Sequence, residues 1–205
     1  GLDAGNILFQ RLIPIGARET VTGLYERLNE LQRQHLGETV ARAVAGFAGE
    51  VQEETAATYG CTRLPEDGEI DWTKPTRAID ALIRALTPPF PGALTYLDGA
   101  ALRIWRAEPV SSPATFAGRI PGRVVARSAA AGTVDVLTGD GVLRIYEVQR
   151  DGSESRTRAA ESIRSVKKSL GLRSSQLLAR IEELEKEVGR LAALMEEKQR
   201  EGISQ

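Results

Sequence analysis

Residues 71–110 read DWTKPTRAIDALIRALTPPFPGALTYLDGAALRIWRAEPV, and in this stretch a helix signal, a proline stop and a hairpin signal follow one another directly. Asp71 is a good N-cap, and Pro75 is tolerated in a first helical turn, where its missing N–H is not needed. Apolar residues then recur at helical spacing, at Ile79, Leu82, Ile83 and Leu86. The prolines that follow Thr87 cannot donate backbone hydrogen bonds, so the helix must end there.

After Gly92 the pattern changes from helix to strand. Asp98-Gly99 is a strong signal for a two-residue hairpin turn, and Leu102 with Ile104 alternates on the return strand. Three more short strands are predicted downstream, around Val124, Val134 to Leu137, and Val142 to Val148, separated by glycine turns that include Gly139-Asp140-Gly141. This spacing favours a small antiparallel β-barrel over a parallel sheet.

The N-terminal segment reads as the end of a different domain. The apolar stretch 7–15 suits a strand, and from the N-cap Thr20 a long amphipathic helix runs toward Gly46 and Gly49. One strand and one helix cannot bury both faces of a sheet, so we expect the last βα unit of an α/β domain whose earlier strands are missing. We therefore predict four parts: an α/β remnant at 1–48, a linker at 49–68, a barrel domain at 69–158 and a helical tail at 159–205.

The tail has a heptad pattern. Its apolar residues are spaced alternately by four and three positions, at Leu177, Ile181, Leu184, Val188, Leu191 and Met195. Such spacing predicts a coiled coil, and β-branched residues alternating with Leu favour two parallel strands, hence a homodimer. Leu194 and Ala192 widen the stripe, so a single amphipathic helix packed on its own barrel is the alternative.

Composition excludes several functions. The formal net charge of −1 gives no general attraction to nucleic acid, and the single Cys61 and single His35 exclude a disulfide and a Cys/His zinc site. No apolar run approaches the roughly 20 residues needed to span a bilayer, and no signal peptide is recognisable, so a cytoplasmic protein without a membrane partner is expected. We expect Trp72 and Trp105 to be packing residues and Asp140 to lie in a hairpin turn. The only methionine is Met195, which suggests a fragment.

Several short motifs resemble one enzyme family in the same order along the chain. They are Leu2-Asp3-Ala4-Gly5-Asn6, Glu69-Ile70-Asp71-Trp72, Pro89-Phe90-Pro91-Gly92, Leu102-Arg103-Ile104-Trp105 and Thr138-Gly139-Asp140-Gly141. Together they resemble the methionyl-tRNA formyltransferase family, which also includes amino-sugar N-formyltransferases. The resemblance covers residue 1 to about residue 149 and leaves the coiled-coil tail outside.

The resemblance implies a cytoplasmic transferase of one-carbon metabolism that takes a formyl group from 10-formyltetrahydrofolate. It also implies a Rossmann-like catalytic domain followed by an OB-like barrel, and no metal. The family's catalytic set is an asparagine, a histidine and an aspartate, and Asp3 matches the aspartate; Leu2 and Asp3 match its folate-contacting segment. The Asn-x-His pair precedes that aspartate in the family, and this sequence lacks it, since His35 follows Asp3. We expect the chain alone to be inactive.

Three functions remain open. The acceptor amine is that of initiator methionyl-tRNA if the barrel has a basic face, because phosphate neutralisation dominates nucleic-acid affinity. Candidate cations are Arg119, Arg123, Arg127, Arg144, Arg156, Arg158, Lys167 and Lys168. The interspersed Glu147, Asp151 and Glu154 make a nucleotide-linked amino sugar the alternative acceptor. A function of another class is a non-catalytic fragment that dimerises through its tail.

Overall fold

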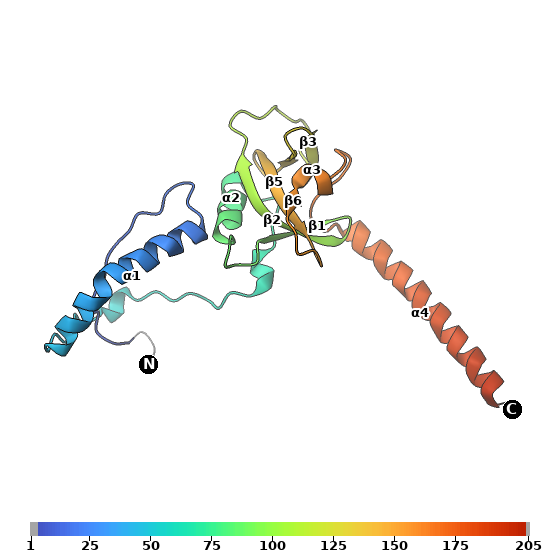
Figure 1. Ribbon diagram of the computed structural model, residues 1–205. Coiled ribbons are helices and arrows are strands. Elements are labelled where there is room, and N and C mark those ends of the chain that lie inside the picture. Colours follow the sequence, from blue (N-terminus) through green and yellow to red (C-terminus); the bar gives the residue numbers. More distant parts are fainter. Residues whose placement is uncertain (1–3, 204–205) are drawn as a thin grey trace.

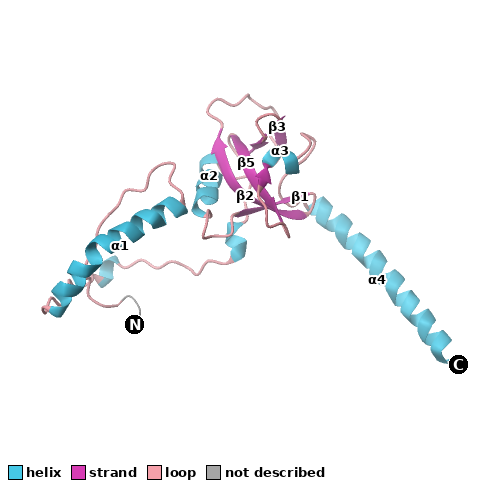
Figure 2. Cartoon of the chain, in the orientation of Figure 1, coloured by secondary structure: helices cyan, strands magenta, loops and turns pink. Residues whose placement is uncertain are grey.

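The computed structural model describes residues 4–203. Figure 1 shows a central sheet domain with a helical arm on its N-terminal side and a long helix that leaves it on the C-terminal side, and Figure 2 marks helices and strands by colour. The arm contains α1 (Val21–Val44) and the short 3-10 turn η1 (Glu54–Ala56). A second such turn, η2 (Pro65–Gly68), leads into α2 (Thr76–Ala85) at the start of the sheet domain.

The sheet is antiparallel and six-stranded. Its strands are β1 (Ala93–Leu97), β2 (Ala100–Pro109), β3 (Val124–Ser128), β4 (Thr133–Leu137), β5 (Val142–Arg150) and β6 (Thr157–Arg158). The strand order is β1-β2-β5-β4-β3, and β6 pairs with β5. The predicted strands after Gly122 are thus confirmed, and so is the tight hairpin, because Asp98 (φ 54°) and Gly99 (φ 82°) both take the positive φ that a type I′ turn needs.

The sheet of the expected OB-like barrel is antiparallel, as predicted, but within residues 4–203 it does not close into a barrel. In the described part of the chain, β1 and β3 are the ends of the sheet and do not pair with each other. Residues 168–171 lie between them: Val124 N–H donates to the Lys168 carbonyl (3.1 Å), and Gly171 N–H donates to the Tyr96 carbonyl (2.9 Å). The edge strands β1 and β3 have only five residues each, and a gap remains between them. The irregular segment 168–171 covers this gap and makes one isolated β-bridge to the chain on each side.

The core lies under helix α2 and extends past the end of the sheet. Ile79 and Ile83 of α2 are each 2% exposed, and this helix packs on β2. The short helix α3 (Ala159–Ser162) packs on β5 and β4, and Ile163 and Leu170 are also buried. The residues just after 158 therefore belong to the packed domain. The free helix of the expected tail, α4 (Ser174–Ile203), begins only at Ser174.

The N-terminal arm agrees with the sequence in its helix but not in its strand. Thr20 caps α1 by accepting from Gly23 N–H (3.3 Å), and Gly46 (φ 99°) follows the end of the helix. The stretch 7–15 forms no strand; within the described residues its backbone makes one isolated bridge, between Ile7 and Glu50. Helix α1 buries none of its residues. A strand needs a neighbour to pair with, and the described arm offers only that one bridge.

Candidate functional site

The proposed catalytic residue Asp3 and its neighbour Leu2 lie outside the described residues, so the structure places this segment only from Ala4 onward. Asn6 donates its side-chain amide to the Ala48 carbonyl (2.9 Å), and Ile7 and Glu50 exchange both backbone hydrogen bonds (2.8 and 2.9 Å). Gly49 has φ 80°, and a Cβ there would lie 2.9 Å from the Ile7 carbonyl oxygen. Gly49 thus lets the loop after α1 contact the segment next to Asp3.

His35 does not offer a free imidazole to this region. Its ring stacks on Phe9, with centroids 4.6 Å apart, and its Nε2 lies 3.5 Å from an Arg11 guanidinium nitrogen. The stacking holds Phe9 of the stretch 7–15 against α1, so this histidine has a packing role.

A hollow of about 830 Å³ lies beside this segment, between residues 4–10 and 51–60. Its lining combines apolar groups such as Ile7, Val51 and Tyr59 with the carboxylates of Glu53 and Glu54. No group of three or more His, Cys, Asp or Glu side chains suited to a metal occurs among the described residues. The charged residues that line the hollow are therefore acidic, and the described part of the chain offers no cluster of metal ligands there.

The arm is joined to the sheet domain by a buried carboxylate. Asp80 of α2 is 3% exposed and accepts hydrogen bonds from Arg18 (2.8 and 2.9 Å) and from Nε of Arg84 (3.0 Å). Arg84 also donates to the Glu19 carbonyl (2.6 Å), so both arginines connect the residues before α1 to α2. The paired guanidinium groups compensate the cost of burying the Asp80 charge.

The loop Gly139-Asp140-Gly141 has a structural role that the sequence did not reveal. The Asp140 carboxylate accepts from Thr76 N–H (2.7 Å) and from the Thr76 hydroxyl (2.8 Å), at the first residue of α2. These hydrogen bonds hold the pKa of Asp140 below its ordinary value. The predicted cap, Asp71, instead accepts from Thr73, in the turn that precedes the helix, so that prediction was wrong. Asp140 is a hairpin-turn residue, as expected, and in addition caps α2 from a distance.

The candidate basic face is largely occupied by contacts within the chain. Arg144 makes two hydrogen bonds to Asp135 (2.7 and 2.8 Å), and this carboxylate raises the pKa of the guanidinium. Arg156 lies 3.5 Å from Glu147 and covers the ring of Trp105. These side chains keep few donors for an external phosphate.

Three further candidate cations also have partners. Arg119 and Arg127 donate to backbone carbonyls, at Gly141 for the first and at Ala160 and Ile163 for the second. Lys168 pairs with Asp98 (2.7 Å). Five of the eight candidate cations therefore have partners within the sheet domain, so the eight do not form one uncompensated basic patch.

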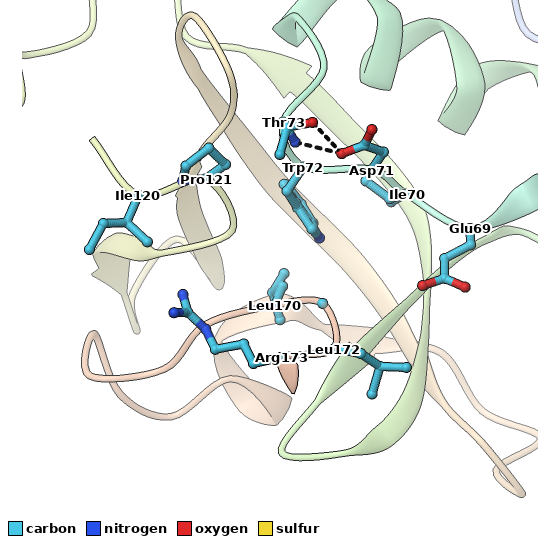
Figure 3. Close-up of a pocket in the computed structure, with 11 residues that line it drawn as sticks. Glu69, Ile70, Asp71, Trp72, Thr73, Ile120, Pro121, Leu170, Leu172 and Arg173 are labelled. Carbon is cyan, nitrogen blue, oxygen red and sulfur yellow. Dashed lines mark hydrogen bonds between the residues drawn. The ribbon is translucent and has the colours of Figure 1, made fainter. Parts of the chain in front are cut away.

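A groove of about 540 Å³ lies between residues 69–73, which precede α2, and residues 170–173 (Figure 3). Trp72 forms its floor: it is 5% exposed and donates its indole N–H to the buried Thr95 hydroxyl (2.9 Å), so it is a core residue as expected. Glu69, Asp71 and Arg173 carry the charges at the rim. Hydrogen bonds from Thr73 keep the pKa of Asp71 below its ordinary value. The rim thus has both signs of charge and no large excess of either.

Comparisons with known proteins agree with the motif resemblance. Residues 64–165 match the family described as "Formyl transferase, C-terminal domain". Curated relatives called methionyl-tRNA formyltransferase include that of Citrifermentans bemidjiense, 34% identical over 155 residues, and that of Gluconobacter oxydans, 37% identical over 153 residues. The alignments cover 75% and 74% of this chain and 46% of each relative. The chain therefore spans about half the length of the relatives it matches.

Among solved structures, HypX from Aquifex aeolicus in complex with tetrahydrofolic acid has a TM-score of 0.61 at 21% identity, covering 78% of this chain and 28% of HypX. A variant of the same protein gives a TM-score of 0.61 at 20% identity, covering 80% of this chain and 29% of the variant. At this identity the likeness shows a shared fold. In the described residues, no helix is long and apolar enough to cross a membrane.

Proposed function

We propose that this chain is part of an N-formyltransferase that transfers a formyl group from 10-formyltetrahydrofolate to a primary amine, because residues 64–165 match the formyltransferase C-terminal domain family. The observation that carries the proposal is the extent of the similarity. The stretch aligned with methionyl-tRNA formyltransferases is 155 residues long in one case, which exceeds the matched domain. The arm and the sheet domain together thus supply the match to enzymes of that name.

The donor is proposed from the relatives and not from a complete pocket in this chain. HypX, which shares the fold, has been solved with tetrahydrofolic acid. The hollow beside residues 4–10 contains Glu53 and Glu54, which would repel the glutamate carboxylates of a folate. The described residues therefore do not by themselves form a folate site. Donor binding requires groups that they do not supply.

We assign the proton-handling carboxylate to Asp3. Attack of an amine on a formyl carbon needs donors for the developing oxyanion and a carboxylate that orients an imidazole and helps take up the amine proton. The sequence has no Asn-x-His, and His35 is stacked on Phe9. Asp3 therefore lacks its partners within this chain, and the chain alone is inactive in this proposal.

The names of the relatives favour initiator methionyl-tRNA as the acceptor. The ion pairs of the sheet domain are a reason to test a nucleotide-linked amino sugar as well. Arg144 and Arg156 are paired with Asp135 and Glu147, and tRNA affinity depends on cations that are free to neutralise phosphates. A nucleotide-linked amino sugar presents the same kind of amine with far fewer phosphates. It needs no extended basic surface.

A formyl-transfer assay with three proteins tests the function: this chain alone, a fusion that places the N-terminal half of the Gluconobacter oxydans relative before Gly1, and the same fusion carrying Asp3→Asn. Each is given 10-formyltetrahydrofolate and either initiator methionyl-tRNA or a nucleotide-linked amino sugar. We expect no turnover by the chain alone and turnover of the tRNA by the fusion. Loss of the carboxylate should lower that rate by roughly 10²- to 10⁴-fold, the usual contribution of a positioned proton-transfer group.

Each other outcome rejects a defined part of the proposal. Turnover by the chain alone overturns its inactivity, and turnover of the amino sugar only changes the acceptor. An unchanged rate for the Asp3→Asn fusion removes the role of Asp3. A fusion that is folded by circular dichroism and binds folate, but formylates neither acceptor, rejects the function.

A further inference from the structure

Helix α4 has an apolar stripe that the sheet domain does not cover. Its first turns border the β1–β2 turn, and the rest of the helix extends away from the domain (Figure 1). Thirty residues of α-helix are about 45 Å long, so the distal turns lie beyond the reach of the sheet. The stripe consists of six side chains that are 43 to 65% exposed: Leu177, Ile181, Leu184, Val188, Leu191 and Met195.

The connection to the domain fixes the direction of this helix. Leu170 is 3% exposed, and Gly171 N–H donates to the Tyr96 carbonyl, so the chain is anchored only a few residues before Ser174. Arg173 also donates to the Ser169 hydroxyl (3.0 Å). The helix is thereby directed outward, and the alternative of an amphipathic helix packed on its own domain does not occur. An exposed apolar face of this length needs another partner.

We propose that the stripe binds a second copy of this chain as a parallel, two-stranded coiled coil. In a heptad frame, Ile181, Val188 and Met195 take position a, and the three leucines of the stripe take position d. Leu at d with β-branched Ile and Val at a favours two strands over three or four. The occupant is a second copy because the stripe complements itself in register, with a against a and d against d.

The flanking charges fit the same register. In a parallel dimer, position g of one helix faces position e of the next heptad of the other, which places Arg180 opposite Glu185 of the second copy. The pair forms twice by symmetry. Within one chain Arg180 contacts Glu183, an exposed pair one turn away that contributes little and can be exchanged. At the next such position Glu187 faces Ala192, so no like charges oppose each other there.

Sedimentation of the intact chain tests the dimer. We expect a species of twice the 22.2 kDa of one chain at micromolar concentration. Val188→Glu puts a charge in the apolar stripe and should reduce the species to one chain. The matched control, Ala193→Glu, adds the same charge at position f, on the opposite side of the helix, and should remain a dimer. Unchanged near-ultraviolet circular dichroism from Trp72 and Trp105, the two tryptophans of the chain, shows that the sheet domain folds in both variants.

Mixing two charge variants tests the parallel register. R180E and E185R each place like charges opposite each other in their own homodimers. Both homodimers should therefore be weaker and dissociate at a higher protein concentration than the dimer of the original chain. Together they restore two opposite-charge pairs, so an equimolar mixture should form the heterodimer preferentially. A single-chain mass for the original protein, a trimer or tetramer, dissociation by Ala193→Glu, or a random mixture of the charge variants would overturn the proposal.

Discussion

Asp140 caps helix α2 from a hairpin that lies 64 residues further along the chain, with 2.7 Å between its carboxylate and the N–H of Thr76. The same oxygen accepts a hydrogen bond from the Thr76 hydroxyl, and that hydroxyl is also 2.6 Å from the Thr138 hydroxyl. The β4–β5 turn and the first residue of α2 are thereby held together. Ile79 and Ile83 of the same helix are buried in one core cluster with Leu143 and Ile145 of β5, the strand that follows this turn.

Replacing Asp140 should weaken this junction. In Asp140→Ala the N–H of Thr76 loses its acceptor, and loss of a helix cap costs about 1 to 2 kcal/mol. Asp140→Asn keeps an acceptor oxygen and should retain most of the stability. The free energy of unfolding from urea titration measures both. Asp151→Ala, which removes an exposed carboxylate from the turn after β5, is the control and should change it little. Equal effects of Asp140→Ala and Asp151→Ala would contradict the capping role.

The cap should also be sensitive to acid. Hydrogen bonds from Thr76 lower the pKa of Asp140 in the folded protein, so the unfolded chain binds more protons between the two pKa values. The stabilisation is therefore complete above the unfolded pKa of about 3.9 and is lost as the pH falls toward the folded pKa. We expect the stability difference between the original chain and Asp140→Asn to shrink below about pH 4. Asp71, whose pKa is also lowered, is present in both proteins and cancels in the difference. A difference that grows on acidification would refute this account.

Gly139 should tolerate no side chain. A Cβ at this position would lie 2.0 Å from the Thr73 carbonyl oxygen, which is backbone and cannot rotate away. Gly139→Ala should therefore force the β4–β5 turn away from α2 and lower the unfolding free energy by about 1 to 3 kcal/mol, as overpacking does. Gly60→Ala, with no atom within 4 Å of the added Cβ, is the control and should be near neutral. Thermal unfolding monitored by circular dichroism compares the two, and a stable Gly139→Ala protein would show that the turn can move freely.

The features that sequence predicts correctly have their stabilising partners nearby in the chain. The Thr20 cap depends on Gly23, and the type I′ turn depends only on Asp98 and Gly99. Features that depend on distant partners were missed or wrong. Asp71 has the right residue type for a cap, but Asp140 occupies that role, and no local pattern distinguishes the two.

The same reasoning applies to the edge of the sheet and to the site. The alternation of apolar and polar residues identifies the strands. Whether β1 pairs with β3 depends on the path of residues 168–171, which are hydrogen-bonded to Gly122 and Tyr96, far away in sequence. Asp3 was found through a motif, and its catalytic role remains a prediction because it lies outside the described residues. The acidic lining of the neighbouring hollow could not be predicted, since Glu53 and Glu54 come from a segment that reads as a linker.

Asp80 should control how firmly the arm is attached to the sheet domain. Asp80→Ala leaves Arg18 and Arg84 without their buried acceptor, and hydrogen bonds to charged groups each contribute about 1.5 to 3 kcal/mol. We expect the unfolding free energy to fall by about that amount and the amides in the first turn of α1 to exchange faster with deuterium. Glu30→Ala, which removes the exposed pair with Arg33, is the control and should change neither quantity measurably. If the exchange of residues 21–24 is the same in the original chain and in Asp80→Ala, the arm is held by its other contacts, such as Thr22 with Thr87, and not by the buried carboxylate.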